Sequence, residues 1–250
     1  MSLLGIQRRG SGPLLVWLHG FTQTKDSAHQ FRSILAGTNE LLTLDLPGHG
    51  ENATILASLD ETADLLAVAL PEEPFSLAGY SFGGRVALHF ALRHPARVNR
   101  LVVLGATRGI RDDAEREQRR RDDDELARRI ETIGAAAFLD EWLAREMFAS
   151  LPNDPLERLA RSTNAAGLAG SLQLAGVGTQ RWLAPDLASL SVPTLALAGA
   201  LDQKFRLEAS AIADTVIVGR SQFVEGAHHA AHLEQPQRCA ASVTDFIDPP

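Results

Sequence analysis

Short, continuous apolar runs recur along the chain, and segments with helical periodicity lie between several of them. Runs that are apolar throughout, rather than alternating, are typical of strands in a sheet that helices cover on both faces. Alternation of such strands with helices predicts a mostly parallel α/β sheet. The expected strands are Leu14–Leu18, Leu41–Asp45, Phe75–Gly79, Leu101–Gly105, Thr194–Ala198 and a weaker Gln222–Glu225, and the expected helices are Ser27–Leu35, Ser58–Leu70 and Phe82–His94.

The alternation of strands and helices stops between Ala106 and Val192, and this stretch is too long for a plain loop. It contains no convincing strand, but Asp124–Ile133 and Ala136–Ala149 have the pattern of amphipathic helices. We therefore expect residues 1–106 and 192–250 to form one α/β core, with residues 107–191 inserted as a helical lid.

The overall composition excludes several classes of protein. No apolar run approaches the length of about 18 residues that a membrane span needs. The formal net charge of −7 over 250 residues argues against non-specific nucleic-acid binding, which needs a basic surface. The single cysteine, Cys239, allows no internal disulfide, and no secretory signal precedes the first expected strand, so we expect a cytoplasmic protein.

The segment Gly79-Tyr-Ser-Phe-Gly-Gly-Arg85 contains the pattern G-x-S-x-G between an expected strand and an expected helix. A serine at such a turn is strained, and its hydroxyl projects above the sheet close to the positive end of the helix dipole. The alternative is a glycine-rich turn with an incidental serine. The position after the run at Phe75 favours Ser81 as a nucleophile or base.

An oxyanion hole beside Ser81 needs two backbone N–H groups. The loop His19-Gly-Phe-Thr22 directly follows the first strong strand, where hydrolase-like folds place one of these donors. We assign the two donors to Phe21 and Phe82. His19 is expected to hold the loop in place, and Asp45 and His49 are expected to shape a neighbouring turn.

A serine hydroxyl needs a histidine and a carboxylate to become reactive. In hydrolase-like folds both follow the serine along the chain, first the acid and then the histidine. Asp202 lies just after the strand at Thr194, whereas Asp186 and Asp214 do not directly follow a strong strand. Three histidines compete after the last strand. We choose His229, with His228 as the alternative, and expect His232 to pack or cap; no carboxylate or cysteine stands near them at a spacing typical of zinc sites.

Arginines indicate an anionic ligand. Residues 108–129 contain eight arginines and eight acidic residues, so most of these arginines are expected on a solvated helix. Arg85 differs because it lies one helical turn after Ser81, where it could hold a carboxylate. Tyr80 could donate a hydrogen bond to a ligand or simply pack.

These residues together resemble the α/β-hydrolase fold and, more narrowly, the 2-succinyl-6-hydroxy-2,4-cyclohexadiene-1-carboxylate synthase family of the menaquinone pathway. The more specific segments are Arg116–Arg121, Trp142 with Phe148-Ala-Ser-Leu151, Arg161-Ser-Thr-Asn164 and Asp202-Gln-Lys-Phe-Arg206. The resemblance implies that Arg161, Lys204 and Trp142 join Arg85 at the substrate. One arginine of the run Arg116–Arg121 should do the same, and counting back from the aspartate that opens the next helix favours Arg119. His228 stands where the family pattern usually has glycine.

The resemblance also implies a lyase, in which the triad serine acts as a base and pyruvate leaves a carboxylate-bearing cyclohexene without an acyl-enzyme. A small-ester or carbon–carbon bond hydrolase on the same Ser81, Asp202 and His229 is the alternative. A catalytically inactive binding protein on this fold is less expected because the triad is intact. No phosphate loop, dinucleotide fingerprint or metal cluster is present in the sequence, so no cofactor and no metal is expected.

Overall fold

The computed structural model describes residues 4–248, and within them seven strands form one sheet in the order β1-β3-β2-β4-β5-β6-β7. Strand β1 is antiparallel to β3, and every other neighbouring pair is parallel. The strands are β1 Ile6–Arg9, β2 Leu14–Leu18, β3 Glu40–Leu44, β4 Phe75–Tyr80, β5 Val98–Leu104, β6 Thr194–Gly199 and β7 Gly219–Val224. All six expected strands are therefore present, while β1 was not predicted.

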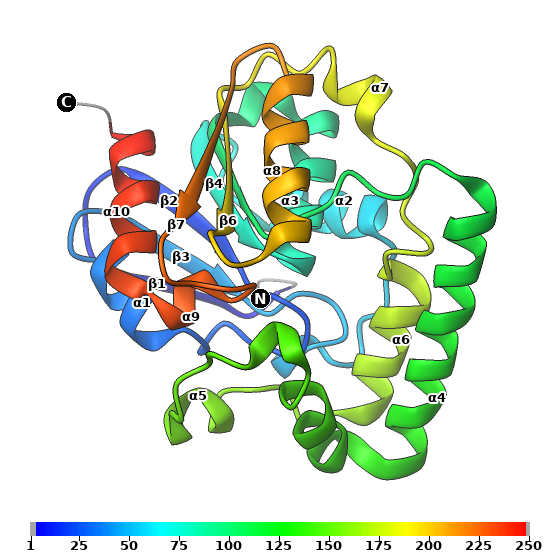
Figure 1. Cartoon of the computed structure of the whole chain (residues 1–250). Helices are drawn as coiled ribbons and strands as arrows, with labels where there is room; N and C mark the ends of the chain where they lie inside the picture. The colour runs from blue at the N-terminus through cyan, green and yellow to red at the C-terminus, as the bar shows by residue number, and fades with distance from the viewer. Residues whose placement is uncertain (1–3, 249–250) are drawn as a thin grey trace.

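Helices cover both faces of the sheet, as Figure 1 shows. The helices are α1 His29–Leu35, α2 Leu59–Ala69, α3 Phe82–Arg93, α4 Asp113–Leu143, α5 Pro155–Leu159, α6 Ala165–Ala175, α7 Ala184–Leu187, α8 Gln203–Thr215, α9 Ala231–Glu234 and α10 Pro236–Ile247, with 3-10 turns at Gly50–Asn52, Pro95–Arg97 and Glu146–Phe148. Helices α1, α9 and α10 lie on one side of the sheet, and α2, α3 and α8 lie on the other. This is the α/β-hydrolase fold expected from the sequence.

Alternating side chains of each strand divide the core into two layers. In β2, Leu15 and Trp17 pack with α1 and α10, whereas Val16 and Leu18 pack with α2 and α3. All four side chains are at most 2% exposed. Burial on both faces explains why the strands read as continuous apolar runs.

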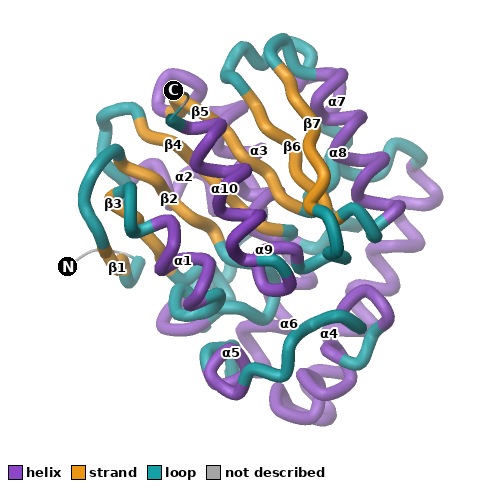
Figure 2. Tube along the Cα trace, turned by 60° about the vertical axis from the view of Figure 1, so that its left-hand side comes forward, coloured by secondary structure: helices purple, strands orange, loops and turns teal. Residues whose placement is uncertain are grey.

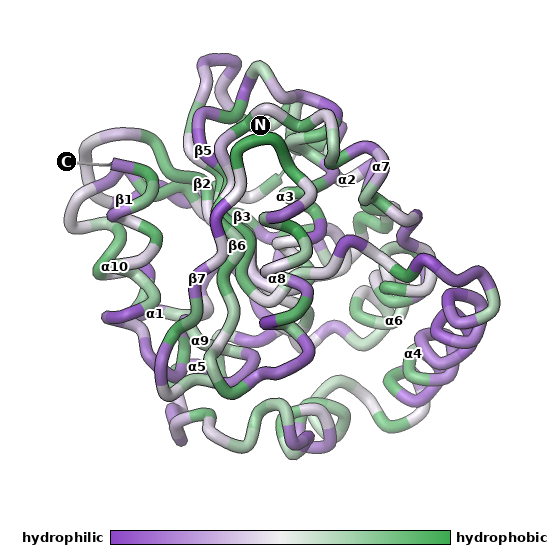
Figure 3. Tube along the Cα trace, turned by 45° about the horizontal axis from the view of Figure 1, so that its top comes forward, coloured by the Kyte–Doolittle hydropathy of each residue, from purple (hydrophilic) through white to green (hydrophobic). Residues whose placement is uncertain are grey.

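The long connection between β5 and β6 contains α4 to α7; in Figure 1 α5 lies below the sheet, and α4 and α6 lie to its right and below. Figure 2 shows α5 below the sheet as well. Helices α4 and α6 pack together through a separate cluster that includes Ile130, Phe138 and Leu168. Much of α4 is hydrophilic (Figure 3). The helix expected at Asp124–Ile133 and most of the one expected at Ala136–Ala149 lie in α4, which is kinked at Gly134 with φ 80° and ψ 162°. The second prediction ran too far, because α4 ends at Leu143 and the turn Glu146–Phe148 follows.

Side-chain caps fix where several helices begin. Ser58 and Glu61 form a capping box at the start of α2. Asp112 accepts a hydrogen bond from the Glu115 N–H at the start of α4, and Asn164 caps α6 in the same way. Within the described residues, no helix has both the length and the apolar composition needed to cross a bilayer.

Candidate active site

Ser81 lies between the end of β4 and the first residue of α3 in a strained conformation, with φ 50° and ψ −104°. Its N–H donates to the carbonyl of Leu104 on β5 at 2.8 Å. A Cβ atom at Gly79 would collide with the Gly83 carbonyl, and one at Gly83 would collide with the Leu18 carbonyl. The glycines of the motif therefore let strand and helix approach closely enough to hold Ser81 in this turn.

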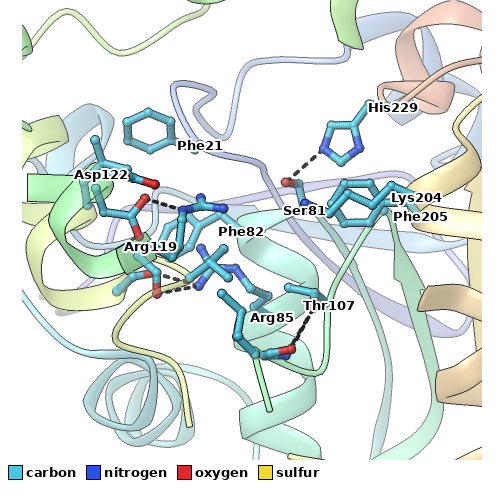
Figure 4. A pocket seen from close by; sticks show the side chains of 18 of the residues that line it. Phe21, Ser81, Phe82, Arg85, Thr107, Arg119, Asp122, Lys204, Phe205 and His229 are labelled. Carbon is cyan, nitrogen blue, oxygen red and sulfur yellow. Dashed lines mark hydrogen bonds and ion pairs between the residues drawn. The ribbon is translucent and has the colours of Figure 1, made fainter. Parts of the chain in front are cut away.

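Ser81, His229 and Asp202 form a hydrogen-bonded chain (Figure 4 shows the first link). His229 Nε2 lies 3.2 Å from Ser81 Oγ, and His229 Nδ1 lies 3.1 Å from Asp202 Oδ2. Burial opposes the charge of Asp202, but hydrogen bonds from His229 and from the Phe205 N–H outweigh it and lower the pKa of the carboxyl group. Since an ionised Asp202 only accepts, Nδ1 carries the proton and Nε2 is left to accept the serine hydroxyl.

Asp202 and His229 are positioned by the ends of two neighbouring strands. Asp202 follows β6 and is also the N-cap of α8, where its Oδ1 accepts the Phe205 N–H at 3.1 Å. One carboxylate thus begins the helix and orients the histidine. His229 follows β7 and is 3% exposed, with its ring 4.4 Å from the Phe205 ring.

The alternative histidines and carboxylates make other contacts and do not join the hydrogen-bonded chain at Ser81. His228 Nδ1 is 2.8 Å from Ser150 Oγ, and the side chain is about one third exposed. His232 is fully buried, with its ring 4.2 Å from the Tyr80 ring, and burial lowers its pKa. Asp186 pairs with Arg181, and Asp214 is exposed on α8. The geometry therefore favours His229 and Asp202 over these alternatives.

The loop after β2 leaves one backbone N–H free. The Gly20 N–H donates to Gln23 Oε1 at 2.9 Å, and the Thr22 N–H donates to His49 Nε2 at 3.2 Å. The Phe21 N–H between them has no acceptor among residues 4–248, and neither has the Phe82 N–H at the start of α3. These are the two donors expected for the oxyanion hole.

Buried, neutral histidines shape this loop. His19 Nε2 accepts the Leu46 N–H at 3.0 Å, and burial lowers the pKa of His19. Burial, followed by the neighbouring His19, lowers the pKa of His49 to about 3. Asp45 accepts the N–H groups of Lys25 and Glu51 at 2.7 and 2.9 Å. Each of the three therefore has the structural contacts expected from the sequence.

A cavity of about 670 Å³ opens above Ser81 and His229. Within the described part of the chain, five cationic and four acidic side chains line it. The cations are Arg85, Arg111, Arg119, Arg145 and Lys204, and the acids are Glu115, Asp122, Asp123 and Glu208. Its walls come from the carboxyl ends of the strands and from α4 and α6, so it lies between the sheet and the inserted helices.

The expected cations differ in their surroundings. Arg85 is 8% exposed, and its Nη1 donates to the carbonyls of Ala175 and Gly176 at 2.8 and 3.2 Å. Burial, followed by the charge of Arg119, lowers the pKa of Arg85 to about 10. Arg119 pairs with Asp123 at 2.8 Å. Arg85 is thus anchored by main chain rather than poised freely over Ser81.

Lys204 lies on the His229 side of the cavity, with Nζ 5.5 Å from the centre of the Phe205 ring (Figure 4). Among the described residues it pairs with no carboxylate. Tyr80 lines the cavity, and its hydroxyl has no hydrogen bond within the described chain. Burial raises the pKa of this hydroxyl, so Tyr80 remains a hydrogen-bond donor. Trp142 forms part of the wall, as the resemblance implies.

Arg161 is absent from the lining of this cavity, so of the four expected cations it stands apart from Arg85, Arg119 and Lys204, and its place at the substrate stays a prediction. Its Nη1 donates to Thr22 Oγ1 at 2.7 Å, and its Nη2 lies 3.4 Å from Glu157 Oε1. It borders a separate cavity of about 770 Å³ together with His232. The Glu157 carboxylate and the Thr22 hydroxyl hold the guanidinium there.

Two cavity cations, Arg111 and Arg145, were missed in the sequence because nothing in their spacing separates them from the other exposed arginines. Within residues 4–248, no group of three histidine, cysteine or acidic side chains is arranged to hold a metal ion. That no cofactor is needed stays a prediction.

Comparison with known proteins defines the family. Residues 15–242 match the model of the alpha/beta hydrolase family. The chain is 34% identical to 2-succinyl-6-hydroxy-2,4-cyclohexadiene-1-carboxylate synthase of Serratia proteamaculans, over 96% of this chain and 95% of that protein. It is 36% identical to the protein of the same name from Escherichia coli O1:K1 / APEC, over 94% of each chain.

Comparison with solved structures points to the same family. MenH from S. aureus superposes with a TM-score of 0.90 and 27% identity, over 99% of this chain and 98% of that one. A thermophilic esterase from Thermogutta terrifontis, solved with malate bound, superposes with a TM-score of 0.82 and 25% identity, over 98% and 92% of the two chains. The chain therefore belongs to the alpha/beta hydrolase family and, within it, to the 2-succinyl-6-hydroxy-2,4-cyclohexadiene-1-carboxylate synthases.

Proposed function

We propose that this protein is a carbon–oxygen lyase of menaquinone biosynthesis. It eliminates pyruvate from 2-succinyl-5-enolpyruvyl-6-hydroxy-3-cyclohexene-1-carboxylate and yields 2-succinyl-6-hydroxy-2,4-cyclohexadiene-1-carboxylate. The observation that carries the proposal is a Ser81–His229–Asp202 chain at a cation-lined cavity, in a protein 34–36% identical over most of its length to synthases of that name. The cytoplasmic location and the small anionic substrate, with no nucleic-acid partner, are part of the same proposal.

The chemistry follows from the substrate. The succinyl group places a ketone next to ring carbon 2, so the proton on that carbon is the acidic one. His229 Nε2 takes the hydroxyl proton of Ser81, and the resulting Ser81 oxygen removes the proton from carbon 2. The C–H electrons form the 2,3 double bond, the old 3,4 double bond becomes the 4,5 double bond, and the bond from carbon 5 to the enolpyruvyl oxygen breaks.

The remaining groups balance charge during this step. The enolate of pyruvate leaves and regains a proton, which returns His229 to its neutral form, and no water is consumed. In this proposal the N–H groups of Phe21 and Phe82, which have no acceptor within residues 4–248, stabilise negative charge that develops on the ketone oxygen. Asp202 stabilises the imidazolium while His229 carries the extra proton.

Cations and donors around the cavity bind the carboxylates in this proposal. Lys204 and Arg119 supply charge from two walls, and Arg85 adds the guanidinium N–H groups that its bonds to Ala175 and Gly176 leave free. Tyr80 offers its hydroxyl, and Trp142 forms an apolar wall. Arg161 acts instead as a positioning residue in this arrangement.

Arg161 contacts the loop His19–Thr22, which carries the Phe21 N–H, through Thr22. Its bond to Thr22 Oγ1 and the bond from the Ser162 N–H to the Thr22 carbonyl, 2.8 Å, hold the residue that follows Phe21. Thr22 has a left-handed backbone with φ 70°, which a β-branched residue adopts only when its surroundings impose it. The Phe21 N–H therefore depends on these contacts for its direction.

A hydrolase of small esters is the second candidate, because the same triad and donors suit acyl transfer and the Thermogutta relative is an esterase. The test measures pyruvate release from the enolpyruvyl substrate with a coupled lactate dehydrogenase assay, beside hydrolysis of p-nitrophenyl acetate. Pyruvate release that is lost in Ser81→Ala is the expected result. Ester hydrolysis without any pyruvate release would support the second candidate instead.

A further inference from the structure

The five cations of the Ser81 cavity are unequally neutralised. Arg85 is bound to main-chain carbonyls, and Arg119 is paired with Asp123. Among residues 4–248, the other three have no carboxylate within ion-pair distance; they are Arg111, Arg145 and Lys204. Unpaired cations that share one cavity repel one another, and an anionic ligand relieves that repulsion.

Arg145 is the one of these three that is held against a cavity wall on the α4 side. It follows the end of α4 and precedes the turn Glu146–Phe148. Its guanidinium carbon lies 4.4 Å from the centre of the Trp142 ring, a stacking distance. Trp142 in turn contacts the ring of Phe21 at 5.3 Å, edge to face. The stack therefore connects Arg145 to the loop that carries the oxyanion donor.

The charges around Arg145 leave it available to a ligand. The carboxylate of Glu141, one turn earlier on α4, is already paired with Arg129 at 2.5 Å. Burial, followed by the charge of Arg119, lowers the pKa of Arg145, so the two guanidinium groups repel each other across the cavity. Arg145 remains charged at neutral pH, and its planar group can bind a carboxylate through two hydrogen bonds.

We propose that Arg145 is a substrate-binding residue that holds a carboxylate at the α4 wall of the cavity. This inference rests on the proposed function, because it takes the substrate to carry several carboxylates. Lys204 stands beside Phe205 and His229 on the α8 wall, so the two cations approach the ligand from different sides. A ligand with separated carboxylates can reach both, whereas a neutral ester uses neither.

The experiment compares Arg145→Gln and Arg145→Lys with Arg128→Gln. Arg128 is the matched control, because it is an exposed arginine on α4 that has no ion pair within the described chain and does not line the cavity. Pyruvate release is measured at several substrate concentrations. Arg145→Gln should raise KM about five- to twentyfold with kcat within about twofold, Arg145→Lys should recover part of the loss, and Arg128→Gln should behave as the parent protein.

Succinate binding, measured by calorimetry, gives a readout that needs no turnover. The dissociation constant should rise about fivefold or more in Arg145→Gln and stay unchanged in Arg128→Gln. Equal values in the two variants, equal KM values, or no saturable succinate binding by the parent protein would each overturn the role of Arg145. If the parent protein released no pyruvate, the proposed function would fail, and succinate binding would still decide whether Arg145 holds a carboxylate.

Discussion

Replacing Arg85 by methionine tests what this buried cation does. Its Nη1 holds the carbonyls of Ala175 and Gly176 at the carboxyl end of α6, where the helix dipole also favours a positive charge. Methionine keeps much of the apolar stem but removes these bonds. Hydrogen bonds from a charged donor contribute about 1.5–3 kcal/mol each. Gly176 keeps a second donor in Thr179 Oγ1 at 3.1 Å, so the expected loss of unfolding free energy is about 2–3 kcal/mol.

The assay is urea unfolding of Arg85→Met beside Arg93→Met. Arg93 lies on the same helix, but its bond to Asp64 is exposed, so its loss should cost less than about 1 kcal/mol. Because Ala175 and Gly176 line the cavity, Arg85→Met should also lower kcat/KM for both pyruvate elimination and ester hydrolysis. A variant as stable as Arg93→Met that fails only with the anionic substrate would refute the anchoring role and leave Arg85 with carboxylate binding alone.

The remaining predictions concern the triad, a buried acid, a helix kink and metal dependence. Ser81→Ala and His229→Ala should each lower kcat by at least about a hundredfold, whereas His228→Ala should change it little; the reverse pattern between the histidines would reassign the base. Asp45→Asn should cost about 2 kcal/mol near neutral pH. Because two backbone N–H groups overcome the effect of burial and lower the Asp45 pKa, this deficit should shrink below pH 3.8 in unfolding measured against pH. Gly134→Ala should lower the melting temperature, since φ of 80° with ψ of 162° costs a non-glycine residue about 1–3 kcal/mol; an unchanged value would mean that α4 straightens freely. Dialysis against a chelator should leave pyruvate release intact, and recovery only on adding a divalent metal would contradict this.

The central strands were predictable because burial on both faces leaves a local signal, an unbroken apolar run. The edge strand β1 was not, because its sequence Ile-Gln-Arg-Arg is short and its two arginines are exposed. The first turns of α4 carry no apolar pattern, and the solvated helix expected there was inferred from charge alone. They are rich in charge and stabilised by pairs one turn apart, such as Arg119 with Asp123 and Arg121 with Glu117, which a pattern of apolar spacing does not detect.

At the site, too, some residues could be predicted from the sequence and others could not. Ser81, Asp202 and His229 each follow the end of a strand. Because parallel strands bring their carboxyl ends to one edge of the sheet, the order of these residues along the chain was enough to predict that they lie together. The arginines of the inserted helices have no such rule. Whether Arg145 or Arg161 reaches the cavity depends on which helix face meets the sheet and on tertiary partners such as Glu157, and neither is encoded in local spacing.

The triad by itself does not decide between elimination and hydrolysis. Both reactions need a basic serine oxygen and two N–H donors, and in both the donors stabilise negative charge that develops on a carbonyl oxygen. What differs is the atom placed before Ser81: a carbonyl carbon leads to attack, and a C–H bond beside a ketone leads to proton removal. Under the proposed function, Lys204 on one wall of this cavity and Arg119 on another select that atom, because they fix where the carboxylates of the ligand lie. Binding energy from groups that do not react is thereby converted into the choice of reaction.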